Sequence, residues 1–150
     1  MADIISTDSV LTASQQQVLT ALLDTLVPAS ADGQLPSAAD VGFADYLLAQ
    51  AEDFLPQLVS ILQHFEPSFG ELSIEERCER VAAFSTDDPQ TFQLLLTRVY
   101  DCYYQNDRVR AQIGVVTGAP FPQGNVVAPG DLSLLDPVIE NAARHRYRES

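Results

Sequence analysis

The fold class is decided by one stretch near the N-terminus, Thr12-Ala-Ser-Gln-Gln-Gln-Val-Leu-Thr-Ala-Leu-Leu-Asp-Thr-Leu-Val-Pro28. It opens with the pattern of a capping box, in which the Thr12 hydroxyl and the Gln15 side chain each satisfy a backbone N–H at the start of a helix. The apolar residues that follow recur at helical spacing: Val18, Leu19, Leu22, Leu23, Leu26 and Val27. Pro28 ends the run, so we predict an amphipathic helix over residues 13–27.

Comparable signals predict further helices along the chain. Ser73-Ile-Glu-Glu76 is a second capping box, and Asp88-Pro89 combines an N-cap residue with proline at the first helical position, where its missing N–H is harmless. Pro56 falls in the first turn of another segment, which Pro67 to Gly70 closes. The predicted helices are 37 or 40 to about 50, about 53 to 66, 73–84, 89–104 and 132 or 134 to 144, with another turn or two at 108–113.

Each of these helices has an apolar face that we expect to be buried. The expected inward residues after the first helix are Phe43, Tyr46, Leu47, Ala51, Leu55, Leu58, Val59, Leu62, Phe65, Ile74, Cys78, Val81, Ala82, Phe92, Leu95, Leu96, Val99, Tyr100 and Tyr103. Cys102 lies one step off the inward face, and we expect both cysteines to be buried as small apolar side chains. We expect His64 to be a surface or boundary residue.

The chain has 150 residues, the length of one ordinary domain. We expect residues 1–10 to be a flexible arm and residues 11–150 to form a single all-α domain of about five or six helices. The stretch 114–130, before the last helix, is rich in glycine and proline, and its length indicates a binding loop or an arm. The pairs Val115-Val116 and Val126-Val127 are candidates for brief extended structure within it.

The charge of the chain is strongly and unevenly acidic. The formal net charge is −13, and all eight basic residues are arginines. Residues 1–76 hold twelve acidic residues and no basic one, whereas residues 77–150 hold nine acidic residues and the eight arginines. This distribution argues against general binding to nucleic-acid phosphates or anionic membranes, which need a basic face. A basic patch on a partner would suit the acidic half, although solubility alone also explains the charge.

The sequence contains none of the usual patterns of a membrane-spanning helix, a metal site or a nucleotide-binding loop. The longest apolar runs are only a few residues, such as Leu94-Leu95-Leu96, so we predict no membrane insertion. The chain has two histidines and two cysteines, none in metal-ligand spacing, and Gly114-Val-Val-Thr-Gly118 has neither the lysine of a phosphate loop nor a dinucleotide fingerprint. We therefore predict no catalytic, cofactor-binding or metal-binding residues in this chain.

One group of aromatic residues points to an interface. Tyr100-x-x-Tyr103-Tyr104 is followed by Ala119-Pro-Phe-Pro122, and at least one of the three tyrosines must point away from the other two. Tyrosine is favoured at protein interfaces because it buries a large area while its hydroxyl stays hydrogen-bonded. Packing of these residues into the core against the proline-rich loop is the alternative. The candidate partner-interface residues are Tyr100, Tyr103, Tyr104, Phe121 and Pro122.

Three segments of the sequence resemble sequences of the gluconate 2-dehydrogenase subunit 3 family. The run 11–29, with Asp24-Thr25-Leu26-Val27-Pro28 at its end, looks like the first helix of that family. Pro36-Ser-Ala-Ala39 looks like its small-residue helix start. The segment Leu94-Leu-Leu-Thr-Arg-Val-Tyr-Asp-Cys-Tyr-Tyr104 resembles its tyrosine-containing helix before a Gly/Pro-rich tail. The resemblance spans most of the chain in order and length.

This resemblance implies a small, non-catalytic helical subunit. Its partner would be a large flavin-dependent dehydrogenase of the glucose–methanol–choline type, which oxidises sugars, sugar acids or alcohols and holds the FAD itself. The small subunit would assist folding, assembly or export of the large one. Many members begin with a twin-arginine export signal, whereas this sequence has no arginine before Arg77. We therefore expect a cytoplasmic protein as written, and a periplasmic one if an export signal has been removed.

Two other functions fit the same sequence. The chain could be a stand-alone cytoplasmic helical ligand-binding protein, or a small enzyme without a recognisable motif, that uses a pocket near Cys78, His64 or the tyrosines. It could also be a former subunit whose dehydrogenase has been lost and that now binds a different cytoplasmic partner.

Overall fold

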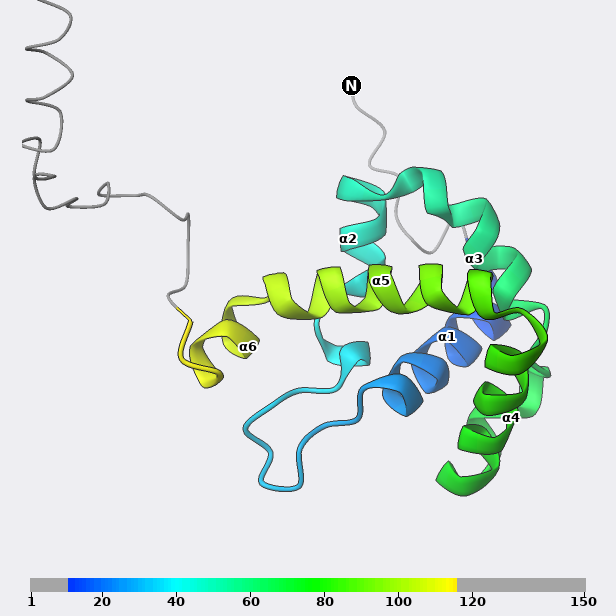
Figure 1. Cartoon of the computed structure of the whole chain (residues 1–150), viewed down its shortest axis with the longest axis horizontal. Helices are drawn as coiled ribbons and strands as arrows, with labels where there is room; N and C mark the ends of the chain where they lie inside the picture. Colours follow the sequence, from blue (N-terminus) through cyan, green and yellow to red (C-terminus); the bar gives the residue numbers. More distant parts are fainter. Residues whose placement is uncertain (1–10, 116–150) are drawn as a thin grey trace, which may run out of the picture. The chain divides into compact units, whose positions relative to one another are not determined.

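Residues 11–115 form a helical body in the computed structural model, which describes this part of the chain (Figure 1). Every regular element in residues 11–115 is helical, so the predicted all-α class is confirmed. The α-helices are α1 (Ala13–Leu26), α2 (Phe43–Gln50), α3 (Leu55–Leu62), α4 (Ile74–Asp87), α5 (Pro89–Gln105) and α6 (Asp107–Gln112), and the 3-10 helices are η2 (Ala38–Asp40), η3 (Glu52–Phe54) and η4 (Pro67–Glu71). The predicted arm 1–10, the predicted helix near 132–144 and all but two residues of the stretch 114–130 lie outside the described residues.

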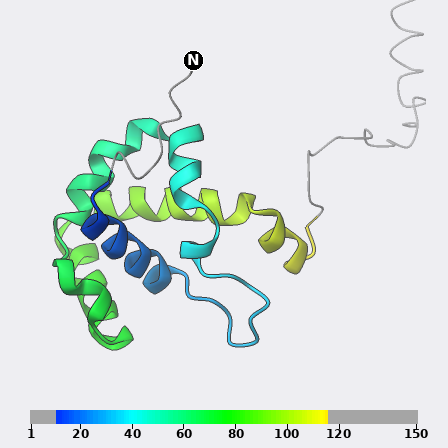
Figure 2. The ribbon, with the colours of Figure 1, turned by 180° about the vertical axis from the view of Figure 1, so that it is seen from behind.

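Helix α1 forms as its sequence predicts and packs against η2, η4, α3 and α4. Both hydrogen bonds of its capping box are present, from the Thr12 N–H to Gln15 Oε1 at 2.9 Å and from the Gln15 N–H to Thr12 Oγ1 at 3.2 Å. Its buried residues are Val18, Leu19, Ala21, Leu22 and Leu23. Helix α5 crosses in front of α2 in Figure 1 and behind it in Figure 2, and the two helices are in contact.

The segment predicted as one helix from residue 37 or 40 to 50 is divided in two. The Ser37 hydroxyl accepts a hydrogen bond from the Ala39 N–H at 2.9 Å and caps only the short η2. Gly42 then takes a left-handed conformation with φ 75° before α2 begins. Glycine adopts such a φ without the steric penalty of a side chain, so it allows the chain to turn between η2 and α2.

Helices α4 and α5 are joined directly through their caps. The Ser73–Glu76 capping box is formed, and the hydrogen bonds from Ser73 hold the pKa of Glu76 below its usual value of 4.5. Helix α4 continues past its predicted end at Phe84 to Asp87. Asp88 then accepts a hydrogen bond from the Thr91 N–H at 3.1 Å, which starts α5. Hydrogen bonding by the Thr91 side chain, and then by its N–H, lowers the pKa of Asp88.

The buried face of α4 differs from the predicted one. Ile74, Cys78 and Ala82 were expected inside, yet all three are exposed. Helix α4 instead turns the Arg77, Val81 and Phe84 side toward the body, at i, i+4 and i+7 spacing. On this side the Arg77 Nη1 donates to the carbonyl of Ala21 at 3.3 Å and lies 3.7 Å from Asp24 Oδ2, while Val81 and Phe84 are buried.

Most other predicted core positions are buried, including Cys102, whose thiol pKa burial raises to about 11. Val59, Phe92 and Leu96 are only half-buried. The side of α5 nearer α3 carries Arg98, whose guanidinium carbon lies 5.9 Å from the ring centre of Phe54 and whose Nη2 lies 3.8 Å from Asp53 Oδ2. These contacts hold α5 against the η3–α3 segment.

The core position of α1 can be tested with a matched pair of leucines. Leu22 is fully buried and Leu94 is 45% exposed, and both lie within α-helices. We expect Leu22→Ala to lower the free energy of unfolding by about 2–5 kcal/mol, because it removes buried methyl groups and leaves a cavity. Leu94→Ala should change it by less than about 0.5 kcal/mol. Urea unfolding followed by circular dichroism measures both, and equal losses would contradict the packing described for α1.

Candidate partner interface

Helix α5 directs its three tyrosines to two different environments. Tyr103 is buried, with 4% of its surface exposed, and its hydroxyl donates a hydrogen bond to the Pro36 carbonyl at 2.9 Å. Burial raises the pKa of the Tyr103 phenol. Because Pro36 ends the long loop between α1 and η2, this bond ties the loop to α5. The structure therefore places Tyr103 in the core.

Tyr100 and Tyr104 lie on the outside of α5, 44% and 54% exposed. The inward position predicted for Tyr100 is wrong, since the buried face of α5 is centred on Leu95, Val99 and Cys102, and Tyr100 falls beyond its edge. The rings of Tyr100 and Tyr104 are 6.1 Å apart, and the Tyr104 ring meets that of Tyr103 edge-on at 5.4 Å. The exposed pair is thus held in place by a tyrosine that belongs to the core.

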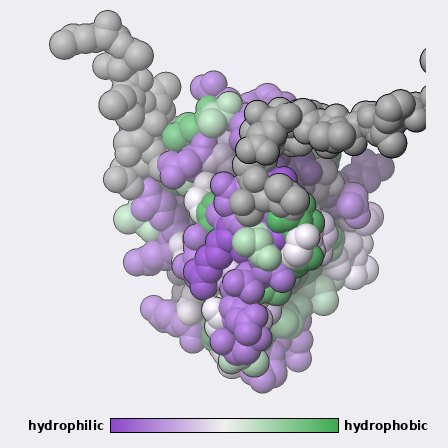
Figure 3. All heavy atoms as spheres, turned by 90° about the vertical axis from the view of Figure 1, so that its left-hand side faces the viewer, coloured by the Kyte–Doolittle hydropathy of each residue, from purple (hydrophilic) through white to green (hydrophobic). Residues whose placement is uncertain are grey.

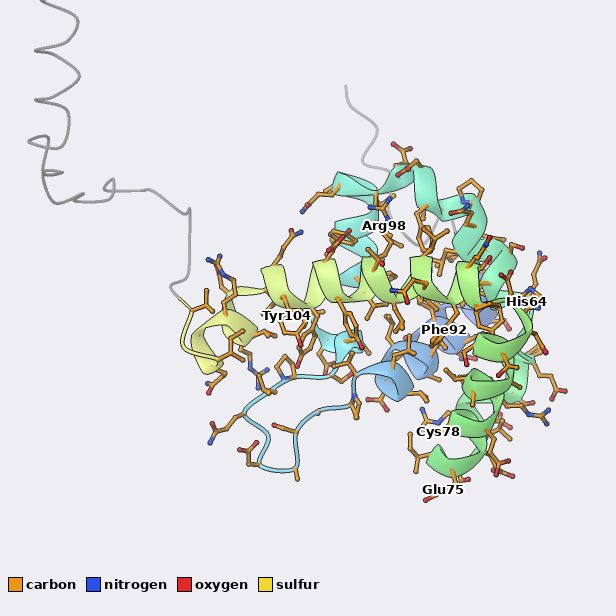
Figure 4. All side chains as sticks on the ribbon, in the orientation of Figure 1. His64, Glu75, Cys78, Phe92, Arg98 and Tyr104 are labelled. Carbon is orange, nitrogen blue, oxygen red and sulfur yellow. The ribbon has the colours of Figure 1, made fainter. Side chains whose placement is uncertain are left out.

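Polar contacts fix the end of the body next to this pair. Arg108, in α6, donates from Nη2 to the carbonyl of Gly33 at 3.2 Å, so α6 and the loop after α1 are connected. Figure 3 shows this end of the molecule as mostly hydrophilic, with apolar residues in small groups. In Figure 4, Tyr104 and Arg98 lie on different sides of α5. The Tyr100–Tyr104 pair therefore lies apart from the contacts that Arg98 makes with η3.

Helix α6 ends where the glycine-rich stretch begins. Gly114 has φ 77°, and the N–H groups of Gly114 and Val115 donate to the carbonyls of Ala111 and Arg110 at 3.2 and 2.8 Å. This is a Schellman motif, which satisfies the last carbonyls of a helix. Ile113 and Val115 are 49% and 45% exposed at this point. The two other candidate interface residues, Phe121 and Pro122, lie outside the described residues.

A second feature is a cleft beside His64, near which a pocket was expected if the chain is a stand-alone ligand-binding protein or small enzyme. It lies between the end of α3, η4 and α4, and its volume is about 290 Å³. Its lining residues are His64, Phe65, Glu66, Phe69, Leu72, Arg80, Ala83, Phe84, Asp87 and Asp88. His64 is exposed, as expected, and forms part of the wall. The sequence feature that could have indicated this wall of the cleft is the spacing of Arg80, Phe84 and Asp87, which places them along one side of α4.

In residues 11–115 no group of three or more histidine, cysteine, aspartate or glutamate side chains is placed to hold a metal ion. None of the helices described here has both the length and the apolar character needed to cross a bilayer.

Comparison with known proteins gives no match, whether with protein-family models, with curated proteins or with solved structures. The resemblance to the gluconate 2-dehydrogenase subunit 3 family therefore rests on the three sequence segments and stays a prediction.

The difference between the buried Tyr103 and the exposed Tyr104 can be tested by removing the hydroxyl of each residue in turn. We expect Tyr103→Phe to lower the free energy of unfolding by about 1–3 kcal/mol, because the buried Pro36 carbonyl loses its donor. Tyr104→Phe is the matched control, and we expect a change of less than about 0.5 kcal/mol at this exposed position. Chemical denaturation of the two variants measures the difference. A Tyr103→Phe variant as stable as the control would show that the Tyr103 hydroxyl is not needed to hold the loop.

Proposed function

We propose that this chain is a non-catalytic accessory subunit that binds a large flavin-dependent sugar or alcohol dehydrogenase and assists its assembly or stability. In this proposal the FAD belongs to the partner, and no residue of this chain takes part in the chemistry. The first support for this proposal is that the segments 11–29, 36–39 and 94–104 resemble sequences of the gluconate 2-dehydrogenase subunit 3 family.

The observation that carries the proposal is the exposed pair Tyr100 and Tyr104 beside the buried Tyr103. Tyrosine rings supply large contact areas at a low cost in side-chain entropy, and residues that contribute most of a binding energy are enriched in tyrosine. The ring of Tyr104 contacts those of Tyr100 and Tyr103, with centroids 6.1 and 5.4 Å apart, and we propose that these contacts order the pair before a partner binds. A preordered aromatic pair loses less entropy on association than a mobile one.

The charge of the chain supports a protein partner with a basic surface. The net charge of −13 creates a negative potential around the molecule, and the first 76 residues carry no positive charge to offset it. Such a potential speeds association with a positively charged surface and weakens as salt is added. We therefore propose that the partner presents basic residues to the acidic first half of this chain.

One observation favours the alternative of a stand-alone ligand-binding protein or small enzyme. The cleft beside α4 is concave, has aromatic residues in its lining and includes His64 and Arg80. Turnover by the purified chain alone, or a visible flavin or metal spectrum in it, would support this alternative over the accessory subunit.

The direct test is purification of the tagged chain from its native host under gentle conditions. We expect a large flavoprotein oxidoreductase to co-purify, identified by mass spectrometry and by the absorption of its flavin. Tyr100→Ala combined with Tyr104→Ala should reduce its recovery at least about tenfold, a loss typical of two residues that each contribute about 1 kcal/mol or more.

Leu94→Ala serves as the control in the same experiment. Leu94 is an exposed apolar residue of α5, 45% accessible, outside the tyrosine pair, and its substitution should leave recovery unchanged. Thermal melting of each variant shows whether the body is still folded. Recovery of the chain as a monomer, without any large oxidoreductase, would contradict the proposed function. Full recovery with the double tyrosine variant would contradict the proposed interface.

A further inference from the structure

The cleft beside α4 is built from two walls. Helix α4 supplies Arg80, Ala83, Phe84 and Asp87, which share one side of the helix, and Asp88 follows directly. The facing wall comes from the end of α3 and from η4, and consists of His64, Phe65, Glu66, Phe69 and Leu72. Figure 4 shows His64 beside the C-terminal end of α4, far from Glu75 at the other end of that helix. The cleft therefore follows the C-terminal half of α4.

Aromatic rings in contact with one another form the floor of the cleft. The Phe65 ring lies 4.8 Å from that of Phe69 and 5.6 Å from that of Phe84, and all three side chains are buried. The exposed imidazole of His64 lies over this floor, 5.2 Å from the Phe84 ring with the two planes tilted by 39°. Because the three phenylalanine rings are only 1–7% exposed, the exposed imidazole of His64 is the aromatic face on which a planar group could stack.

The rim of the cleft carries more negative than positive charge. It holds three carboxylates, Glu66, Asp87 and Asp88, and one guanidinium, that of Arg80. Asp88 is engaged in capping α5 through Thr91. Within residues 11–115 the carboxylates of Glu66 and Asp87 have no hydrogen-bond or ion-pair partner. Two carboxylates are thus available to a ligand next to an aromatic floor.

The two ends of the α4 wall of the cleft carry opposite charges, with Arg80 at one end and Asp87 at the other. Arg80 and Asp87 are separated by seven residues, about 10 Å along the helix axis. A cationic group would be repelled near Arg80 and attracted near Asp87, and an anionic group would behave in the opposite way. The sign of the ligand charge can therefore be determined by removing the charge at either position.

We propose that this cleft binds the guanidinium group of an arginine side chain that the partner protein presents. The proposal rests on the proposed function, since it requires a protein partner. A guanidinium is planar, stacks on aromatic faces and donates in pairs to carboxylates, which matches the exposed ring of His64 beside the carboxylates of Glu66 and Asp87. The volume of about 290 Å³ lies at the lower end of the range for ligand pockets, which suits one side chain better than a cofactor such as FAD.

The test is a titration of the full chain with N-acetyl-arginine amide, followed by NMR of the backbone amides. We expect shifts at Phe65, Phe84 and Asp87, and no comparable shifts with the neutral citrulline analogue. Asp87→Asn should weaken binding about two- to fivefold, and Arg80→Gln should tighten it by a similar factor, as for single charge contacts at a protein surface. Circular dichroism checks that both variants are folded.

Glu75→Gln is the matched control for a general charge effect. Glu75 is exposed, lies on the same helix as Asp87 and is not part of the cleft lining. Its substitution changes the net charge as Asp87→Asn does, so it should leave the affinity unchanged if the cleft binds the probe. Equal weakening by the two substitutions would overturn the proposal, because it would mean attraction to the acidic molecule as a whole.

Other outcomes would also overturn this proposal. Binding of the citrulline analogue as tightly as the arginine probe would exclude recognition of the guanidinium charge, and weaker binding of the arginine probe to Arg80→Gln would mean that Arg80 supports binding and does not repel the probe. Tighter binding of the free amino acid arginine than of its capped form would indicate a small-molecule ligand instead of a side chain. The titration needs no partner, so its failure leaves the co-purification result intact. Binding of the probe without any co-purifying flavoprotein would contradict the proposed function alone.

Discussion

The hydrogen bond from the buried Tyr103 hydroxyl to the Pro36 carbonyl acts together with the buried Leu95, Val99 and Cys102 to orient α5 on the rest of the body. It joins the longest helix of residues 11–115 to the end of the loop that follows α1. With Tyr103 held inside, helical geometry places Tyr104 one step around the helix, toward solvent, and Tyr100 beyond the edge of the buried face. The exposed aromatic pair is therefore a consequence of the packing of its neighbour.

Sequence patterns predicted the helices of this part of the chain better than the faces that they bury. Capping boxes and proline positions act within a few residues, so the starts of α1, α4 and α5 could be predicted locally. The buried face of α4 could not, because α4 packs against α1, and Arg77 contacts the carbonyl of Ala21, which is 56 residues away in the sequence. The division at Gly42 was missed because a glycine inside an amphipathic pattern does not itself reveal its φ.

The same limit applies to the candidate sites. The spacing of the three tyrosines required that they point in different directions, but only tertiary packing decides that Tyr103 is the buried one. A pocket near His64 was expected only for the alternative function, and its other wall could not be predicted, because no local pattern brings His64 and Glu66 together with Arg80 and Asp87. The N-cap pattern explains Asp88, which starts α5, but it says nothing of Asp87, the last residue of α4, which lines the cleft.

Both proposed contacts use exposed groups that lie against buried aromatic residues. Tyr104 contacts the buried Tyr103, and the cleft lies against the buried rings of Phe65 and Phe84.

The most direct measurement for the tyrosine pair is hydroxyl-radical footprinting with mass spectrometry, on the free chain and on the chain with its co-purified partner. Tyr100 and Tyr104 should be oxidised in the free chain and protected in the complex, whereas Tyr103 should be protected in both. Rapid oxidation of Tyr103 in the folded free chain, or unchanged oxidation of Tyr100 and Tyr104 in the complex, would contradict this division of α5 into a core face and a binding face.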